Sequence, residues 1–273
     1  MYDFKFKEKK EIQSRPEDFL IFVKRLLPRW ANGIPDSECI AIYKTLKLLK
    51  RKNKKLILLE TGIGASTIAM FLFCALNGGR IFSWDTNGSK GSFLRNVINE
   101  AICQVLKIDV NKIWKFIPSD STDPHVGIRV LNELKIKADF CFFDSIHTHQ
   151  HVMKEVYEFE KVASKSFILA FDDAYYTKRH SNFSYINMLR HKLNLAKIKE
   201  PKNNVGKPLY IEIYEYLNQK YKYVNKIKDH YKKNYKKDIF FHYYNFDRQF
   251  MNKLGMEEKN KLSHRFDAFK VIK

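Results

Sequence analysis

The sequence predicts an α/β protein with a doubly wound, mostly parallel seven-stranded sheet, to which N-terminal helices and a helical insertion are added. Three observations predict this class. Five short apolar runs occur between residues 56 and 171, stretches of helical pattern separate them, and polar or acidic residues follow each run. Short apolar strands that alternate with helices are typical of a parallel sheet with both faces covered.

The five runs define the strands of the predicted core, which are 56–59, 80–84, 114–117, 139–143 and 167–171. The helical patterns that follow them lie at 68–75, 92–106, 125–135 and 149–162. Two helices are expected before the core, at 17–27 and 37–51. A long helix is expected from 210 to 235, because apolar residues recur there at spacings of three and four. Closing strands are expected at 238–244 and 266–272.

The charge of the chain is unevenly distributed. The chain has 50 Lys and Arg against 30 Asp and Glu, a net charge of +20. Residues 56–173 hold 12 basic and 14 acidic residues, whereas residues 1–55 carry a net +8 and residues 174–273 a net +14. The basic flanks are expected to attract an anionic partner, such as an acidic glycan, a nucleotide sugar or RNA. A solvated lysine-rich face and a purely compositional excess of lysine stay open.

These differences predict four segments. They are an N-terminal helical segment 1–55, an α/β core 56–173, a basic helical insertion or cap 174–237, and closing strands 238–273.

The apolar segments are short. None approaches the roughly 18 residues of a transmembrane helix, and the basic N-terminus has no apolar stretch of signal-peptide length. We therefore expect a cytoplasmic protein. Cys39, Cys74, Cys103 and Cys141 lie in apolar surroundings without a CxxC pair, so they are expected to be buried free thiols.

Polar residues collect after the predicted strands. Because the carboxyl ends of parallel strands meet at one edge of a sheet, these side chains are expected to surround one site. Clustered carboxylates repel one another unless a cation or hydrogen-bond donors are present. The sequence therefore predicts a polar ligand, a metal ion, or both. The residues concerned are Glu60, Gly62, Gly64, Asp85, Ser119, Asp120, Asp144, His147, Asp172 and Asp173.

The glycine turn ETGIGAST lies between a predicted strand and a predicted helix. Gly62 and Gly64 let the backbone approach a ligand, toward which the first amides of the helix point. Thr67 occupies the third glycine position of a nicotinamide-binding turn, and the lysine of a Walker motif is missing. Glu60 would repel a pyrophosphate but suits a cationic ligand, and Asp85, 21 residues after Gly64, can accept ribose hydroxyls. The inferred ligand is adenosine with a positive centre, although both acids also fit another nucleotide protein or a helix cap.

These motifs resemble those of class I S-adenosylmethionine-dependent methyltransferases. The resemblance covers residues 56–173, which are 118 of the 273 residues, and depends on LLETGIGAST, Asp85 and the pair Ser119-Asp120. It implies a Rossmann-like methyltransferase fold and S-adenosylmethionine as the cofactor. The cofactor-binding residues that it implies are Glu60, Gly62, Gly64, Ser66, Asp85, Ser119 and Asp120.

Two further segments, FFDSIHTHQHV and FILAFDDAYY, resemble those of metal-dependent O-methyltransferases that act on small molecules and sugars. This resemblance implies that Asp144, Asp172 and Asp173 hold a divalent cation, Mg²⁺ being the expected ion. A structural role for the three acids without a metal ion stays open.

The resemblance also bears on the general base. It implies that Asp144 takes part in catalysis, and His147, three residues after Asp144, can accept the proton of the acceptor at neutral pH. The family often has an acid at the position of Ile146, so the identity of the base stays open, with His147 preferred. His147 also fits a solvated or capping histidine, as do its neighbours His149 and His151.

The predicted function is methyl transfer from S-adenosylmethionine to a hydroxyl of a small molecule or sugar. Transfer from a sulfonium requires in-line alignment and removal of the acceptor's proton. The alternative is an RNA ribose methyltransferase or a nucleic-acid-binding protein that uses the basic flanks. The motifs of adenine-N and cytosine-C5 methyltransferases are missing. A non-catalytic binding protein, binding to anionic membranes and a homo-oligomer also stay open.

Overall fold

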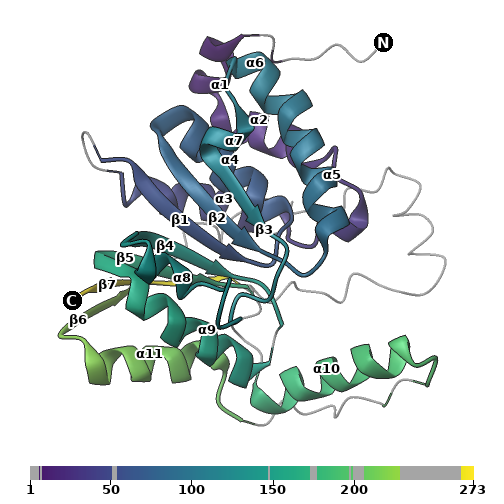
Figure 1. Ribbon diagram of the computed structural model, residues 1–273, viewed down its shortest axis with the longest axis vertical. Helices are drawn as coiled ribbons and strands as arrows, with labels where there is room; N and C mark the ends of the chain where they lie inside the picture. Colours follow the sequence, from purple (N-terminus) through teal and green to yellow (C-terminus); the bar gives the residue numbers. More distant parts are fainter. Residues whose placement is uncertain are drawn as a thin grey trace.

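The protein folds around a seven-stranded sheet (Figure 1). The computed structural model describes residues 6, 8–50, 54–146, 148–172, 177–196, 198, 206–227 and 266–273. The strands are β1 (Leu56–Thr61), β2 (Gly79–Trp84), β3 (Trp114–Ile117), β4 (Ala138–Phe143), β5 (Ala163–Phe171), β6 (Tyr223–Lys226) and β7 (Asp267–Ile272). Their order is β3-β2-β1-β4-β5-β7-β6. The first five in this order are parallel, and β7 is antiparallel to both β5 and β6.

Helices cover both faces of the sheet (Figure 1). One face carries α1 (Lys9–Ser14), α2 (Pro16–Lys24), α3 (Asp36–Lys47), α4 (Ala65–Asn77), α5 (Gly88–Ile98), α6 (Gln104–Leu106) and α7 (Val110–Ile113). The other carries α8 (Val130–Glu133), α9 (His149–Val162) and α11 (Leu209–Lys220). The helix α10 (Lys178–Lys192) extends away from these layers (Figure 1). Short helical turns are Arg29–Ala31 and the π-helix Asn99–Cys103.

The central strands are apolar on both faces, which explains their uninterrupted apolar runs. In β4, Phe140 and Phe142 belong to the core on the α4 face, whereas Cys141 and Phe143 belong to the core on the α9 face. All four side chains are buried. Because successive residues of a strand point to opposite faces, a strand inside a covered sheet is apolar at most of its positions.

The predicted fold class is confirmed. The five predicted core strands all form, and the predicted N-terminal helices at 17–27 and 37–51 correspond to α2 and α3. The helix predicted at 125–135 is much shorter, since only α8 is helical there. One end of the sheet is antiparallel because β7 lies between β5 and β6 and runs in the opposite direction to both.

The prediction of one long helix from 210 to 235 is wrong. The helix α11 ends at Lys220, Tyr221 is extended, and β6 follows as an edge strand that pairs with β7. Tyr221 donates a hydrogen bond to Glu160 at 2.6 Å, which holds the chain away from a helical path. Tyrosine and valine favour strands, so tertiary pairing overrides the helical spacing. The strand predicted at 238–244 lies outside the described residues.

The cysteines agree with their prediction. Cys39, Cys74, Cys103 and Cys141 are free and buried, and burial raises the pKa of the Cys74 thiol well above its ordinary value. Within the part of the chain that the structure describes, no helix is both long and apolar enough to cross a membrane.

Candidate functional site

A cavity of about 420 Å³ opens at the carboxyl ends of the parallel strands. Its floor consists of the segments that follow β1, β2, β3, β4 and β5, as expected for a doubly wound sheet. One wall comes from the N-terminal segment, through Trp30, Ala31, Gly33 and Ile34. The remaining lining residues are Gly62, Ile63, Gly64, Ala65, Trp84, Asp85, Thr86, Lys90, Ser119, Asp120, Ser121, Asp144, Ser145, Ile146, His151 and Asp172.

The glycine turn connects β1 to α4 and lines the cavity. Gly62 has φ +79°, and a Cβ at this position would lie 1.9 Å from the carbonyl oxygen of Asp144. Its amide donates to the Trp84 carbonyl at 2.7 Å. Gly62 is therefore needed both for its backbone conformation and for the close approach of the chain that follows β4.

Glu60 lies beneath the glycine turn and has no exposed surface. Its carboxylate accepts hydrogen bonds from the hydroxyls of Ser66 at 2.5 Å, Thr67 at 2.8 Å and Ser83 at 2.9 Å. Burial raises the pKa of Glu60 to about 7, even though these three bonds oppose the shift. Neither Glu60 nor Ser66 is among the residues that line the cavity. Their hydrogen bonds stabilise the glycine turn on its side away from the cavity.

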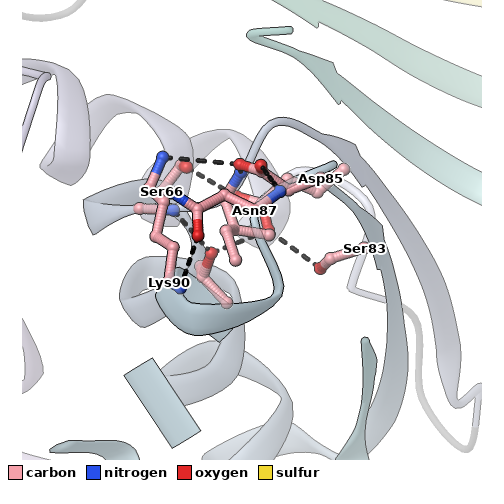
Figure 2. Close-up of polar contacts among 9 residues, drawn as sticks. Ser66, Ser83, Asp85, Asn87 and Lys90 are labelled. Carbon is pink, nitrogen blue, oxygen red and sulfur yellow. Dashed lines mark hydrogen bonds and ion pairs between the residues drawn. The ribbon is translucent and has the colours of Figure 1, made fainter. Parts of the chain in front are cut away.

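Asp85 follows β2 and lines the cavity. Its Oδ2 accepts the amide of Ile63 at 3.1 Å and lies 3.4 Å from Lys90 Nζ, and its Oδ1 accepts the amide of Asn87 at 2.8 Å. Figure 2 shows Asp85 and Lys90 converging at the start of α5. Asn87 caps this helix by accepting the Lys90 amide at 3.0 Å. The Asp85 carboxylate is thus held in one orientation at the edge of the cavity.

Ser119 and Asp120 follow β3 and both line the cavity. Asp120 Oδ1 accepts the amide of Thr122 at 2.7 Å and its hydroxyl at 2.8 Å. Burial opposes ionisation, but these bonds outweigh it and hold the pKa of Asp120 below its ordinary value. Asp120 is therefore an ionised acceptor at the wall of the cavity.

Asp144 and Asp172 follow the neighbouring strands β4 and β5, and both line the cavity. The amide of Asp144 donates to Thr61 at 2.8 Å and that of Asp172 to Phe143 at 3.1 Å, which places the two residues at adjacent strand ends. The predicted third ligand Asp173 and the predicted base His147 lie outside the described residues. Among the residues that are described, no group of three or more His, Cys, Asp or Glu side chains is arranged to hold a metal ion.

Two side chains of the site, His151 and Lys90, were not predicted from the sequence, and neither was the ion pair that anchors its N-terminal wall. His151 lines the cavity, and its Nε2 lies 3.3 Å from Oε1 of Glu155, whose side chain is completely buried. Lys90 lies beside Asp85. The wall formed by the N-terminal segment is anchored by a buried ion pair, in which Lys24 Nζ lies 3.0 Å from Asp36 Oδ1. The His151–Glu155 spacing is visible in the sequence, but the burial of Glu155 is not.

Comparison with known proteins identifies the core. A family model described as a methyltransferase domain matches residues 59–174. The match covers 116 of the 273 residues, so this part of the chain is similar to a methyltransferase domain. The match includes the glycine turn and each strand end that lines the cavity floor, so the predicted resemblance to S-adenosylmethionine-dependent methyltransferases is confirmed.

One solved structure agrees on the fold, and two others are similar to the chain at lower scores. An O-methyltransferase from Bacillus cereus in complex with SAH has a TM-score of 0.53 at 12% identity, with 97% of this chain and 96% of that chain covered. The O-methyltransferase TomG from Streptomyces achromogenes, in complex with SAM, has a TM-score of 0.48 at 9% identity, with coverage of 100% and 99%. Magnesium protoporphyrin IX methyltransferase from Synechocystis PCC 6803, with bound SAH, has 0.48 at 10% identity, with 97% of both chains covered. No curated protein matches the chain.

Proposed function

We propose that the protein transfers a methyl group from S-adenosylmethionine to a hydroxyl of a small molecule or sugar, with a divalent cation aligning the acceptor. The similarity of residues 59–174 to a methyltransferase domain supports the reaction class. One observation carries the proposal further. Two pairs of acids line a single cavity, Asp85 and Asp120 after β2 and β3, and Asp144 and Asp172 after β4 and β5. A nucleoside and an acceptor can thus be held side by side.

The first pair suits the cofactor. Asp85, fixed by the Ile63 amide, can accept the two hydroxyls of a ribose, and Asp120 can accept from the amino group of a base. The backbone at Gly62 and Gly64 lies at the cavity surface, which leaves room for the rest of the cofactor. In this proposal Glu60 and Ser66 act through the turn that they hold, because both lie below the lining of the cavity.

The second pair suits the acceptor. Asp144 and Asp172, with Asp173 as the third carboxylate, would hold a divalent cation, and carboxylate oxygens are the ligands that Mg²⁺ prefers. When bound, such a cation lowers the pKa of an acceptor hydroxyl. His147 is the proposed proton acceptor. The net charge of +20 favours an anionic acceptor.

Calorimetric titration with S-adenosylmethionine tests the cofactor half. We expect the wild type to bind it and Asp85→Asn to lose about 10–100-fold in affinity, since a hydrogen bond to a charged group contributes about 1.5–3 kcal/mol. Glu133→Gln, on the exposed surface of α8, is the matched control and should bind like the wild type. If the wild type does not bind the cofactor, the proposed function is wrong.

A methyl-transfer assay tests the acceptor half. Radiolabelled S-adenosylmethionine is offered with a panel of nucleotide sugars, neutral and acidic glycans, small-molecule diols and RNA, with Mg²⁺ or with excess chelator. The proposal expects label on a small molecule or glycan, and only when Mg²⁺ is present. Full methyl transfer in the presence of chelator would contradict the role of the cation. Label on RNA alone would contradict a small-molecule or glycan acceptor.

A further inference from the structure

We propose that His151, held by the buried Glu155, recognises the purine base of the cofactor together with Asp120, and so determines its specificity for adenine. This inference rests on the proposed function, because it requires S-adenosylmethionine to occupy the cavity. It concerns two residues that have no part in the binding set predicted from the sequence.

Glu155 connects three segments around the cavity. Its Oε1 accepts hydrogen bonds from Ser121 in the segment after β3 and from Ser145 after β4, the latter at 2.7 Å. The third partner is His151 Nε2 at 3.3 Å, one turn earlier on α9. All three partners line the cavity, whereas Glu155 is completely buried. A carboxylate in this position can orient groups that reach a ligand, but it does not line the cavity itself.

The burial of Glu155 favours the protonated form of His151. A buried carboxylate needs a compensating positive charge, and the serine hydroxyls are neutral. Burial of His151 works against its protonation, but the hydrogen bond and charge of Glu155, and then the charge of Asp120, raise the pKa of this imidazole above its ordinary value. Lys154 acts in the opposite direction. The raised pKa favours the protonated ring, in which Nε2–H is directed to Glu155 and Nδ1–H is a second donor.

Asp120 supplies the matching acceptor. The bonds from Thr122 both go to Oδ1, so within the described residues Oδ2 keeps its capacity to accept from a ligand. Asp120 and His151 line the same cavity and interact electrostatically. One wall therefore offers a carboxylate acceptor beside an imidazole donor.

This pairing fits adenine. The exocyclic amino group of adenine is a donor, and the ring nitrogens beside it are acceptors. Asp120 can accept from the amino group while His151 donates to the neighbouring ring nitrogen N1, which carries no proton in adenine. Hypoxanthine has a carbonyl in place of the amino group and a protonated N1, so its carbonyl oxygen would face the Asp120 carboxylate. A site with buried polar groups rejects a ligand that leaves them unpaired.

The test compares two cofactor products that differ only in the base, S-adenosylhomocysteine and S-inosylhomocysteine, by calorimetric titration. We expect the wild type to prefer the adenosyl compound. His151→Ala should lose about tenfold in affinity for it, the loss typical of one hydrogen bond, and much less for the inosyl compound. The ratio of the two affinities should therefore fall about tenfold. Glu155→Gln should shift the ratio in the same direction.

Two further variants keep the test specific. His151→Gln retains a side-chain N–H donor and should recover part of the adenosyl preference, which a loss of packing would not explain. His191→Ala, which replaces an exposed histidine of α10, should leave the ratio unchanged. The melting temperature of each variant shows whether it folds, and if His151→Ala does not, the same ratio measured for His151→Gln and Glu155→Gln decides the outcome.

The outcomes separate this inference from the proposed function. If the wild type binds neither compound, the proposed function fails. If it binds the adenosyl compound and the ratio is the same in the His151 variants, the base-recognition role is wrong while the proposed function stands. Unchanged affinities with a complete loss of turnover would instead identify His151 as part of the proton-transfer machinery and overturn the proposal.

Discussion

The two halves of the cavity are held together by different kinds of contact. On the nucleoside side, the carboxylates are bonded mostly by close neighbours in sequence, such as Thr67 for Glu60, Asn87 for Asp85 and Thr122 for Asp120. On the acceptor side, the contacts join residues that are farther apart in the sequence, as between the Asp144 amide and the Thr61 carbonyl or between the Asp172 amide and the Phe143 carbonyl. The nucleoside side is thus a product of local sequence, and the acceptor side a product of the whole fold.

The largest expected effect separates the two halves by function. Asp144→Asn and Asp172→Asn should each reduce methyl transfer by about 10³-fold, the scale on which loss of a preorganised charged group acts in catalysis. The Kd for S-adenosylmethionine should stay within about twofold of the wild type, because one hydrogen bond contributes more than such a change. Single-turnover rates and titrations measure the two quantities.

A matched control makes this comparison sharper. Glu133→Gln removes an exposed carboxylate and should change neither the rate nor the Kd. If the Asp144 and Asp172 variants lose cofactor binding as strongly as methyl transfer, the division of the cavity into two halves is incorrect.

The next largest expected effect is a loss of stability at Gly62, where the nucleoside side of the cavity contacts the chain at Asp144. Gly62→Ala should destabilise the fold by about 3 kcal/mol or more, since the new Cβ would lie 1.9 Å from the Asp144 carbonyl at a φ of +79°. Gly33→Ala is the control, because a Cβ there meets nothing within 4 Å. Urea denaturation of both variants provides the measurement, and equal stabilities would contradict the assigned contact.

The smallest effect concerns the buried acid under the glycine turn. The pKa of Glu60 is raised from 4.5 to about 7 by burial, so the folded state binds a proton more tightly than the unfolded state. Its contribution to stability is complete below pH 4.5 and is lost as the pH rises through about 7. The melting temperature of the wild type should fall by on the order of 5 °C across this window. In Glu60→Gln this decline should be reduced.

The matching measurement is a set of thermal melts between pH 4.5 and 8. Glu133→Gln should keep the slope of the wild type, because its side chain is exposed. Identical slopes in all three proteins would show that Glu60 is not the group that titrates.

Much of the fold could be predicted because its signals are local. The run ADFCFF is apolar at every position except Asp139. Apolar residues on both faces are typical of a central strand of a parallel sheet. The end of the sheet could not be predicted. The residues of β6 have a spacing that also fits a helix, and only their pairing with β7, more than 40 residues later, makes them a strand.

The candidate site divides in the same way. Asp85, Asp120, Asp144 and Asp172 were predicted as site residues because each follows an apolar strand, and all four line the cavity. Glu60 fits the same pattern, yet its side chain points below the turn, where the hydroxyls of Ser66, Thr67 and Ser83 surround it. The sequence marks which residue follows a strand but not which side of a turn its side chain occupies.

The position of β7 in the sheet has a consequence for synthesis. This strand pairs with both β5 and β6, yet its residues 267–272 leave the ribosome after those of the other six strands of the described sheet. Until they emerge, β5 presents an open edge and β6 has no partner in the described sheet. Open strand edges are where chains associate wrongly. A growing chain can therefore assemble its ligand-binding strands early, but it can close the sheet only after these last six strand residues have been made.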